Sequence, residues 1–170
     1  MDDPLPRNEP VIVVMGIAGT GKTTVGRRVA AALGWEFLDG DDLHPAANVA
    51  KMARGVPLTD EDRAPWLERV RERIAGYLAR GTGAVVACSA LKRRYRARLR
   101  VDPARVHFVH LEGDPPLLHA RLAARAGHYM KAGLLDSQLA ALEPPRRALA
   151  IDAALPVDAI VARIRSAIGR

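Results

Sequence analysis

The sequence predicts an α/β fold in which helices cover both sides of a parallel sheet. Three observations lead to this prediction. Apolar runs such as PVIVVMG and AVVACS lack polar alternation, which is typical of strands buried on both faces of a parallel sheet. These runs alternate with segments of helical periodicity along the chain, which indicates βαβ units. No repeat, low-complexity tract or linker divides the 170 residues, so we expect a single domain over 1–170.

The first strand is expected in PVIVVMG, and a glycine-rich turn and the helix TTVGRRVAAALG follow it. This helix is expected to end at Gly34, because glycine is common at helix C-termini. Its predicted buried stripe consists of Val25, Val29, Ala32 and Leu33. WEFLDG is the second expected strand, and residues 43–55 form the next expected helix. The predicted packing face of that helix consists of Val49, Met52 and Ala53.

A longer helix is expected to begin after Thr59. Threonine is a favoured N-cap, and three acidic residues follow it, where the helix dipole favours negative charge. The predicted buried residues of this helix are Leu67, Val70, Ile74, Tyr77 and Leu78. The third strand is expected in AVVACS, and the helix ALKRRYRARL comes after it.

The helix in ALKRRYRARL has a predicted buried stripe of Leu91, Tyr95 and Leu99. Its arginines are therefore expected to be mostly solvated and not to form a nucleic-acid patch. These arginines are Arg94, Arg96, Arg98 and Arg100. The fourth strand is expected in VHFVHL and the next helix in DPPLLHARLAARA. A short helix around LLDSQLAAL, a fifth strand in RALAID and a terminal helix in VDAIVARIRSAIG complete the pattern.

The charge composition marks places where a ligand is expected. The net charge is +7, and of 26 basic residues only four are lysines: Lys22, Lys51, Lys92 and Lys131. Because lysine and arginine are not interchangeable at a binding site, the few lysines mark candidate positions. The lone Cys88 ends an apolar run and is expected to be a small buried hydrophobe. With no signal peptide or long apolar stretch, we expect a cytoplasmic protein that does not enter a membrane.

A phosphate-binding loop is predicted at residues 16–23, GIAGTGKT. The segment matches GxxxxGK(S/T) directly after a strand and directly before a helix, which is the context of a P-loop. The predicted ligand is ATP with Mg²⁺, since no Asn-Lys-x-Asp segment for reading guanine is present. Lys22 is expected at the β and γ phosphates and the Thr23 hydroxyl on the magnesium. The predicted nucleotide-binding residues of the loop are Gly16, Ile17, Ala18, Gly19, Thr20, Gly21, Lys22, Thr23 and Thr24.

The stretch FLDGDDLHP, residues 37–45, crowds three aspartates at the end of the second strand. A solvated turn is the simplest interpretation. In a parallel α/β sheet, however, this strand end faces the crevice that the P-loop borders. If the strand continues, Asp39 and Asp41 share one face. One carboxylate is then expected near Mg²⁺ and the other at the hydroxyl of a phosphoryl acceptor, where a raised pKa suits a base.

Further polar residues are candidates for the acceptor and for a lid. His44, Asn48 and Lys51 fall on one helical face, which is either solvated or the wall of a pocket for a polyhydroxy anion. Lys92 begins a helix, where a cation opposes the helix dipole, so an anionic ligand would explain it. The remaining candidates are Arg54 beside the polar face and the basic run of Arg121, Arg125, His128 and Lys131. The basic run indicates a mobile lid or, alternatively, a salt-bridged surface helix.

These motifs together resemble the gluconate kinases, small P-loop kinases of the shikimate-kinase-like type. The resemblance rests on GIAGTGKT, FLDGDDLHP, NVAKMARGVPLTDEDRAPWL, CSALKRRYR and RLAARAGHYMK, in this order. It implies a three-layer fold with five parallel strands in the order 2-3-1-4-5, a lid at about 121–142 and a homodimer. Residues 1–9 are expected to be a flexible N-terminal segment. The segment EPPRRALAID, between the expected lid and the last strand, looks short for the family. The wall that faces the adenine is therefore the part of the site that the resemblance does not define.

The resemblance also implies an activity and residue roles. The activity is transfer of the ATP γ-phosphate to the 6-hydroxyl of D-gluconate, which feeds the pentose phosphate or Entner–Doudoroff route. Asp41 matches the acceptor-binding base, Asp39 the carboxylate near Mg²⁺, and Arg125 a lid arginine at the phosphates. Lys22, Asp41 and Arg125 are the expected catalytic residues, and Arg121 is expected beside the nucleotide. The expected substrate-binding residues are Asp41, His44, Lys51, Arg54, Lys92, His128 and Lys131.

Three alternatives remain open at this point. The nearest is a kinase of another small sugar acid or polyol, and the next is a nucleotide kinase. A P-loop ATPase that binds nucleic acid belongs to a different class. The sequence disfavours it, because the arginines are interleaved with acids and only two Phe and three Tyr are available for stacking.

Overall fold

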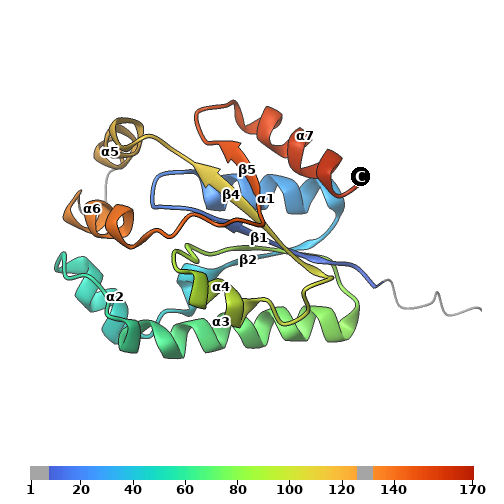
Figure 1. The fold of residues 1–170 in the computed structure, drawn as a ribbon, viewed down its shortest axis with the longest axis horizontal. Helices are drawn as coiled ribbons and strands as arrows, with labels where there is room; N and C mark the ends of the chain where they lie inside the picture. The colour runs from blue at the N-terminus through green and yellow to red at the C-terminus, as the bar shows by residue number, and fades with distance from the viewer. Residues whose placement is uncertain (1–7, 126–131) are drawn as a thin grey trace, which may run out of the picture.

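The computed structural model describes residues 8–125 and 132–170, and its centre is a five-stranded parallel sheet in the order β2-β3-β1-β4-β5 (Figure 1). Strands β1 and β3 coincide with the unbroken apolar runs of the sequence, and the predicted strand order is confirmed. The strands are β1 Val11–Met15, β2 Glu36–Asp39, β3 Ala84–Ala87, β4 Val106–Glu112 and β5 Leu149–Asp152.

Seven helices surround this sheet within the described residues. The helices are α1 Lys22–Leu33, α2 Ala46–Ala53, α3 Asp60–Arg80, α4 Arg93–Leu99, α5 Pro115–Ala123, α6 Ala132–Ala141 and α7 Val157–Ala167. A short 3₁₀ helix, η1, spans Gly40–Leu43. None of the helices in this described part is long and apolar enough to cross a membrane.

Two apolar clusters make the fold three layers thick, as the α/β prediction requires. Val11, Val13 and Met15 of β1 face α3 and α4, whereas Ile12 and Val14 face α1 and α7. The period of two arises because successive side chains of a strand point to opposite faces. Since both faces are covered, β1 is buried throughout and its sequence is apolar at every position.

The long helix α3 follows its sequence pattern closely. Thr59 and Asp62 form a capping box, in which each side chain accepts from the other residue's backbone N–H. Gly81 ends the helix in the left-handed conformation, with φ of 65°. All the residues predicted to be buried are buried, and Trp66 joins them.

Helix α1 differs from its prediction in the direction of its buried face. Ala32 is exposed, and Ala30 is buried instead, with 2 % of its surface accessible. The reason is Gly26, where an added Cβ would lie 2.7 Å from Cε2 of Phe37. The missing side chain lets β2 approach, so the buried stripe is rotated toward Gly26 and Ala32 is left at its edge.

Two other packing predictions are wrong. Helix α2 is shorter than residues 43–55, since Pro45 is its N-cap, and only Met52 of its predicted packing face is buried. Val49 is 40 % exposed, and Ala53 is exposed. On α4, Arg96 is buried, not solvated. Its guanidinium donates to the carbonyls of Ala90, Leu91 and Glu143, because the chain from α6 to β5 crosses over this helix.

Candidate active site

A cavity of about 430 Å³ lies at the carboxyl end of the sheet. Its wall consists of the loop after β1, the turn after β2, the C-terminal half of α2, the start of α3 and one side of α6. This is where an open parallel sheet places its ligands. Several of the residues predicted from separate motifs meet here, including Lys22, Thr23, Asp39, Asp41 and His44.

The P-loop between β1 and α1 is held in shape by its glycines and by its own hydrogen bonds. An added Cβ at Gly16 would lie 2.7 Å from the carbonyl oxygen of Leu111, so the loop runs directly against β4. Gly21 has φ of 91° and leaves open space where a Cβ would stand. Thr20 donates through Oγ1 to the carbonyl of Ile17 at 2.8 Å. The loop is therefore preformed, and its backbone faces the cavity.

Lys22 brings an ammonium group to this loop. Its Nζ donates to the Ile17 carbonyl at 3.2 Å. Removal from water lowers the pKa of Lys22, while the carboxylates of Asp41 and Asp39 oppose that shift. Within the described residues no carboxylate lies at ion-pairing distance from it. Lys22 is therefore an amino group placed in a cleft, and a bound anion would favour its charged form.

Thr23 and Asp39 form the side of the cavity next to α1. The Thr23 hydroxyl donates to Oδ2 of Asp39 at 2.9 Å, and Oδ1 of Asp39 accepts from the N–H of Asp41 at 3.0 Å. Strand β2 therefore ends at Asp39, which caps the turn η1. The expectation that Asp39 and Asp41 share one face of a continued strand is wrong, but both still line the cavity.

The turn at Gly40 is fixed from two sides. A Cβ at Gly40 would lie 2.7 Å from the carbonyl oxygen of Ala87 in β3, so no larger residue fits without movement. On the other side, Nε1 of the buried Trp66 donates to the Gly40 carbonyl at 2.7 Å. These contacts direct Asp41 and Asp42 toward the cavity.

His44 follows this turn and stacks on Trp66, with ring centroids 4.3 Å apart. Burial, and then the positive charge of Arg63, lowers the pKa of His44 to about 4, so the ring is neutral near pH 7. Asn48 Nδ2 contacts Nδ1 of His44 at 3.3 Å and donates to the Asp62 carbonyl at 2.9 Å. Since an amide nitrogen only donates, Nδ1 is the acceptor and Nε2 carries the proton. Nε2 lies 3.9 Å from Oδ1 of Asp41.

The rest of the predicted polar face of α2 does not reach the cavity. Asn48 is 3 % exposed and ties α2 to α3, so the face is neither solvated nor a pocket wall at this position. Lys51 forms an ion pair with Asp62 at 2.8 Å, and Arg54 is exposed at the C-cap of α2. Substrate contacts by Lys51 and Arg54 remain predictions.

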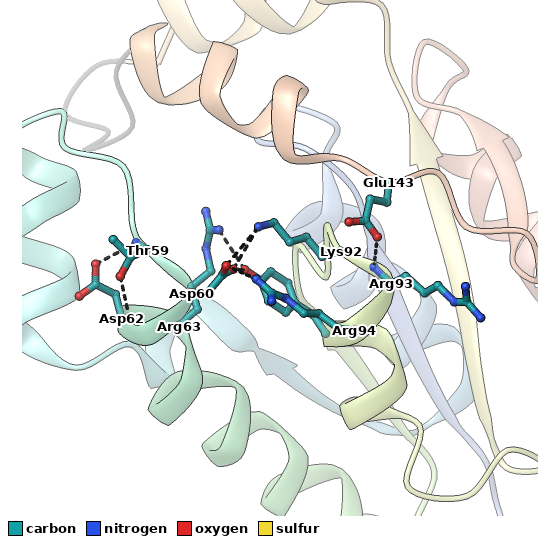
Figure 2. A network of polar contacts seen from close by, with 9 residues as sticks. Thr59, Asp60, Asp62, Arg63, Lys92, Arg93, Arg94 and Glu143 are labelled. Carbon is teal, nitrogen blue, oxygen red and sulfur yellow. Dashed lines mark hydrogen bonds and ion pairs between the residues drawn. The ribbon is translucent and has the colours of Figure 1, made fainter.

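A network at the start of α3 and α4 holds the predicted Lys92 (Figure 2). Asp60 accepts from Lys92 Nζ at 3.1 Å and also from Arg94 and Tyr95. Its three donors hold the pKa of Asp60 well below the usual range. Lys92 does not line the cavity, so its contact with an anionic ligand stays a prediction.

Arg63 is the cation that the sequence reasoning missed. It lines the cavity and donates to the Tyr95 hydroxyl at 3.2 Å (Figure 2). No carboxylate in the described part of the chain lies at ion-pairing distance from it. The signal was present in the sequence, because Arg63 stands in the first turns of a helix, where a cation opposes the dipole.

The predicted lid residues have different positions. Arg125 lines the cavity beside the P-loop. Arg121 instead donates to the carbonyls of Gly19 and Ala153, so it braces the P-loop from behind. His128 and Lys131 lie outside the described residues. Among the P-loop positions, Gly16, Ile17, Thr20 and Thr24 do not line the cavity, so their contacts with the nucleotide stay predictions.

Helix α6 forms a wall that the sequence did not predict. Leu134, Ser137 and Gln138 line the cavity from one side of this helix. Oε1 of Gln138 accepts from the backbone N–H of Ala18 in the P-loop at 2.8 Å. The sequence carries only a weak signal for this contact, since Gln138 stands in an otherwise apolar and small-residue segment.

The donor set fits a nucleoside triphosphate with magnesium. Gly21 exposes backbone to the cavity, Lys22 supplies a cation, and Thr23 and Asp39 supply oxygens. Residues 8–125 and 132–170 contain no cluster of three His, Cys, Asp or Glu that could hold a metal ion. Mg²⁺ usually keeps several of its waters and binds through one or two protein oxygens and substrate phosphates, and Thr23 and Asp39 offer such oxygens.

Comparison with known proteins connects this site to a family. Residues 11–145 match the family described as AAA domain. A gluconokinase of Gluconobacter oxydans is 54 % identical over 134 residues, which cover 79 % of this chain and 75 % of that protein.

Two solved structures are similar over nearly the whole chain. An unliganded sugar kinase from Janibacter sp. HTCC2649 has a TM-score of 0.88 and 41 % identity, covering 95 % of both chains. A gluconokinase from Sinorhizobium meliloti has a TM-score of 0.82 and 43 % identity, covering 96 % of this chain and 97 % of the other.

Proposed function

The chain belongs to the gluconokinase family, and we propose that it transfers the terminal phosphoryl group of ATP to the 6-hydroxyl of D-gluconate. The product is 6-phospho-D-gluconate, a substrate of the pentose phosphate and Entner–Doudoroff routes. The observation that carries the proposal is one cavity in which a P-loop lysine, an aspartate and an arginine meet. These are the groups that phosphoryl transfer to an anionic polyol requires.

The nucleotide half of the proposal concerns the P-loop. Its backbone and Lys22 would hold the phosphates, while Thr23, with Asp39 behind it, would hold Mg²⁺. When bound, Mg²⁺ neutralises charge on the phosphate oxygens. The contact of Thr23 with Asp39 at 2.9 Å supports this, because it orients the hydroxyl beside a carboxylate. Arg125 lines the same cavity and is proposed to contact the transferring group.

The acceptor half concerns Asp41. Phosphoryl transfer needs a carboxylate that orients the hydroxyl and takes its proton. Asp41 lines the cavity from the turn after β2, on the same side as the proton-bearing nitrogen of His44. We assign the base to Asp41, and we assign to His44 the orientation of the Asp41 carboxylate.

The gluconate carboxylate needs a cation, and Arg63 suits it better than Lys92. Arg63 lines the cavity and meets no carboxylate among the described residues, and its planar guanidinium matches a carboxylate geometrically. Lys92 is engaged by Asp60. Two variants compare them directly. Arg63→Met should raise KM for gluconate at least about tenfold and leave KM for ATP within about twofold. The matched variant Lys92→Met should change both less.

The opposite ranking of the two variants would assign the gluconate carboxylate to Lys92, as the sequence predicts. If Lys92→Met raises KM for gluconate more than Arg63→Met does, the acceptor anion binds at Lys92. Equal effects on gluconate and ATP would make either residue a phosphate ligand.

A coupled ADP-release assay tests the function itself. It offers gluconate, gluconolactone, glycerate, shikimate and nucleoside monophosphates at equal concentration. We expect turnover with gluconate to exceed each of the others at least about a hundredfold in kcat/KM, since unpaired polar groups penalise the wrong acceptor. Activity with a competitor and none with gluconate would replace the substrate. Tight binding of mixed DNA and RNA at moderate salt would revive the nucleic-acid alternative.

The compartment, the oligomeric state and the lid belong to the same proposal. We propose that the enzyme works in the cytoplasm as a homodimer and that residues 121–142 act as a lid. The sequence position supports the lid. Arg125 precedes residues 126–131 and α6 follows them, and both Arg125 and α6 line the cavity.

A further inference from the structure

Helix α6 touches the phosphate loop through one polar contact. The Ala18 N–H donates to Oε1 of Gln138 at 2.8 Å across 120 residues of sequence. Ala18 is the third residue of GIAGTGKT, and it lines the cavity together with Gly19, Gly21 and Lys22. Gln138 lines that cavity as well. The side-chain amide therefore lies where the P-loop, the nucleotide site and α6 meet.

The remainder of α6 is fixed by apolar packing and by its C-terminal end. Leu135 is fully buried in a cluster with Ile17 and Ala18 of the P-loop. Just after the helix, the Glu143 N–H donates to the Leu91 carbonyl, and the Arg93 N–H donates to Glu143 (Figure 2). These contacts hold the helix against the body of the protein. The contact between Gln138 and Ala18 then fixes how the cavity side of α6 is oriented relative to the phosphate loop.

The N-terminal part of α6 reaches the acceptor side. Leu134 is 4 % exposed and forms a small buried cluster with Met52 of α2 and Leu58 of the α2–α3 connection. All three residues also line the cavity. One helix thus connects the phosphate loop at Gln138 with the acceptor wall at Leu134, about one turn apart.

From this arrangement we infer that Gln138 is a positioning residue beside the terminal phosphate of the nucleotide. Its carbonyl, held by Ala18, fixes α6 as the wall that shields the transferring phosphoryl group from water. A neutral amide suits the place, because it anchors the helix without adding a negative charge next to the phosphates. The inference rests on the proposed phosphoryl transfer, but its first test needs no acceptor.

The first test is nucleotide binding by Gln138→Glu. The carboxylate can accept the same bond from Ala18, so this anchor remains, while a negative charge replaces the N–H donors of the amide. Calorimetric titration with Mg²⁺ compares ADP with the β,γ-imido analogue of ATP. We expect Kd for the triphosphate to rise at least about tenfold and Kd for ADP to rise less than about threefold, because repulsion is greatest at the terminal phosphate. Ala140→Glu, which adds the same charge at an exposed position of α6 outside the cavity, should change both less than about twofold.

The second test removes the anchor with Gln138→Leu. Losing one hydrogen bond should lower kcat/KM for phosphoryl transfer about threefold to tenfold. It should also raise ATP hydrolysis without acceptor relative to transfer, because the wall no longer excludes water. Thermal unfolding establishes that each variant folds, and if the leucine variant does not, the glutamate variant decides alone.

The inference would be overturned if Gln138→Glu raised Kd equally for both nucleotides, or raised it for neither. An unchanged ratio of hydrolysis to transfer in Gln138→Leu would overturn it as well. Failure of the wild-type enzyme to phosphorylate gluconate would instead refute the proposed function, and the binding result would still decide the role of Gln138.

Discussion

The neutral His44 should make folding stability depend on pH in a way that one substitution removes. Its side chain is 6 % exposed and stacks on Trp66, and burial lowers its pKa from 6.5 to about 4. In the unfolded chain the same ring titrates at its ordinary value. Between these two pKa values the unfolded state binds a proton that the folded state does not. Stability is therefore fully present above about pH 6.5 and is lost as the pH falls toward 4.

The size of the effect follows from the two pKa values. One unit corresponds to about 1.4 kcal/mol, so the full shift amounts to about 3 kcal/mol. Between pH 7 and pH 5 the unfolded histidine becomes almost fully protonated while the folded one stays mostly neutral. That interval should cost about 2 kcal/mol of the free energy of unfolding.

Urea unfolding of the ligand-free protein at half-unit steps from pH 7.5 to 4.5 measures this cost. His44→Gln should be less stable than wild type at pH 7, since it loses the stack on Trp66, but it should lose about 2 kcal/mol less on going to pH 5. Taking the difference between the two proteins cancels the other titrating groups, including the buried His110. His107→Gln, at an exposed position of β4, controls for removing a histidine as such. Parallel curves for wild type and His44→Gln would refute the argument.

Three further substitutions test other parts of the structure. Gly40→Ala should lower the free energy of unfolding by about 1–3 kcal/mol, because its Cβ would lie 2.7 Å from the Ala87 carbonyl, and an unchanged urea midpoint would contradict that. Arg96→Met should cost about 2–4 kcal/mol in the same assay, since the buried Ala90 carbonyl loses its guanidinium donor and the Leu91 and Glu143 carbonyls each lose one hydrogen bond, whereas a loss below about 0.5 kcal/mol would show that water replaces the guanidinium. Asp41→Asn should lower kcat at least about a hundredfold while calorimetry finds ATP binding intact, and near-normal turnover would remove Asp41 from the role of base.

The fold could be predicted from the sequence because its signals are local or cumulative. Buried strands read as unbroken apolar runs, and the cap of α3 is visible in Thr59 and its acids. The error at α1 has a tertiary cause. In the sequence Gly26 is one more position of a helical pattern, but its lack of a Cβ determines which face packs on β2. A helical stripe fixes a face only approximately, and the close approach of a neighbour decides the rest.

The site was predictable where a motif combines backbone conformation with chemistry. The P-loop is such a motif, and the cavity forms on it. The turn at 39–43 was only half predictable. The aspartates indicated a function, but the end of β2 is set by Asp39 capping its own turn and by Trp66 holding Gly40 from 26 residues away. The α6 wall was not predictable, because no local pattern indicates that Gln138 will meet Ala18.

The cations show why spacing alone could not assign the acceptor site. The scarcity of lysine marked Lys51 and Lys92, yet both pair with acids in the first turn of α3. The helix dipole explains acids at this position without any basic partner, and Asp62 also belongs to a capping box. Ion pairs depend on which elements pack together, and residues 32 positions apart, such as Asp60 and Lys92, give no sign of it in the sequence.

The same pairing accounts for the position of Arg63. A carboxylate that already accepts from several donors gains little from another cation, and Asp60 accepts from Lys92, Arg94 and Tyr95. Arg63 is left with the Tyr95 hydroxyl, which itself donates to Asp60, so the guanidinium is oriented without being neutralised. Asp60→Asn would weaken this arrangement at its source. It would release Lys92 and Arg94 from their ion pairs and loosen Tyr95, so gluconate affinity should fall although Asp60 itself does not line the cavity.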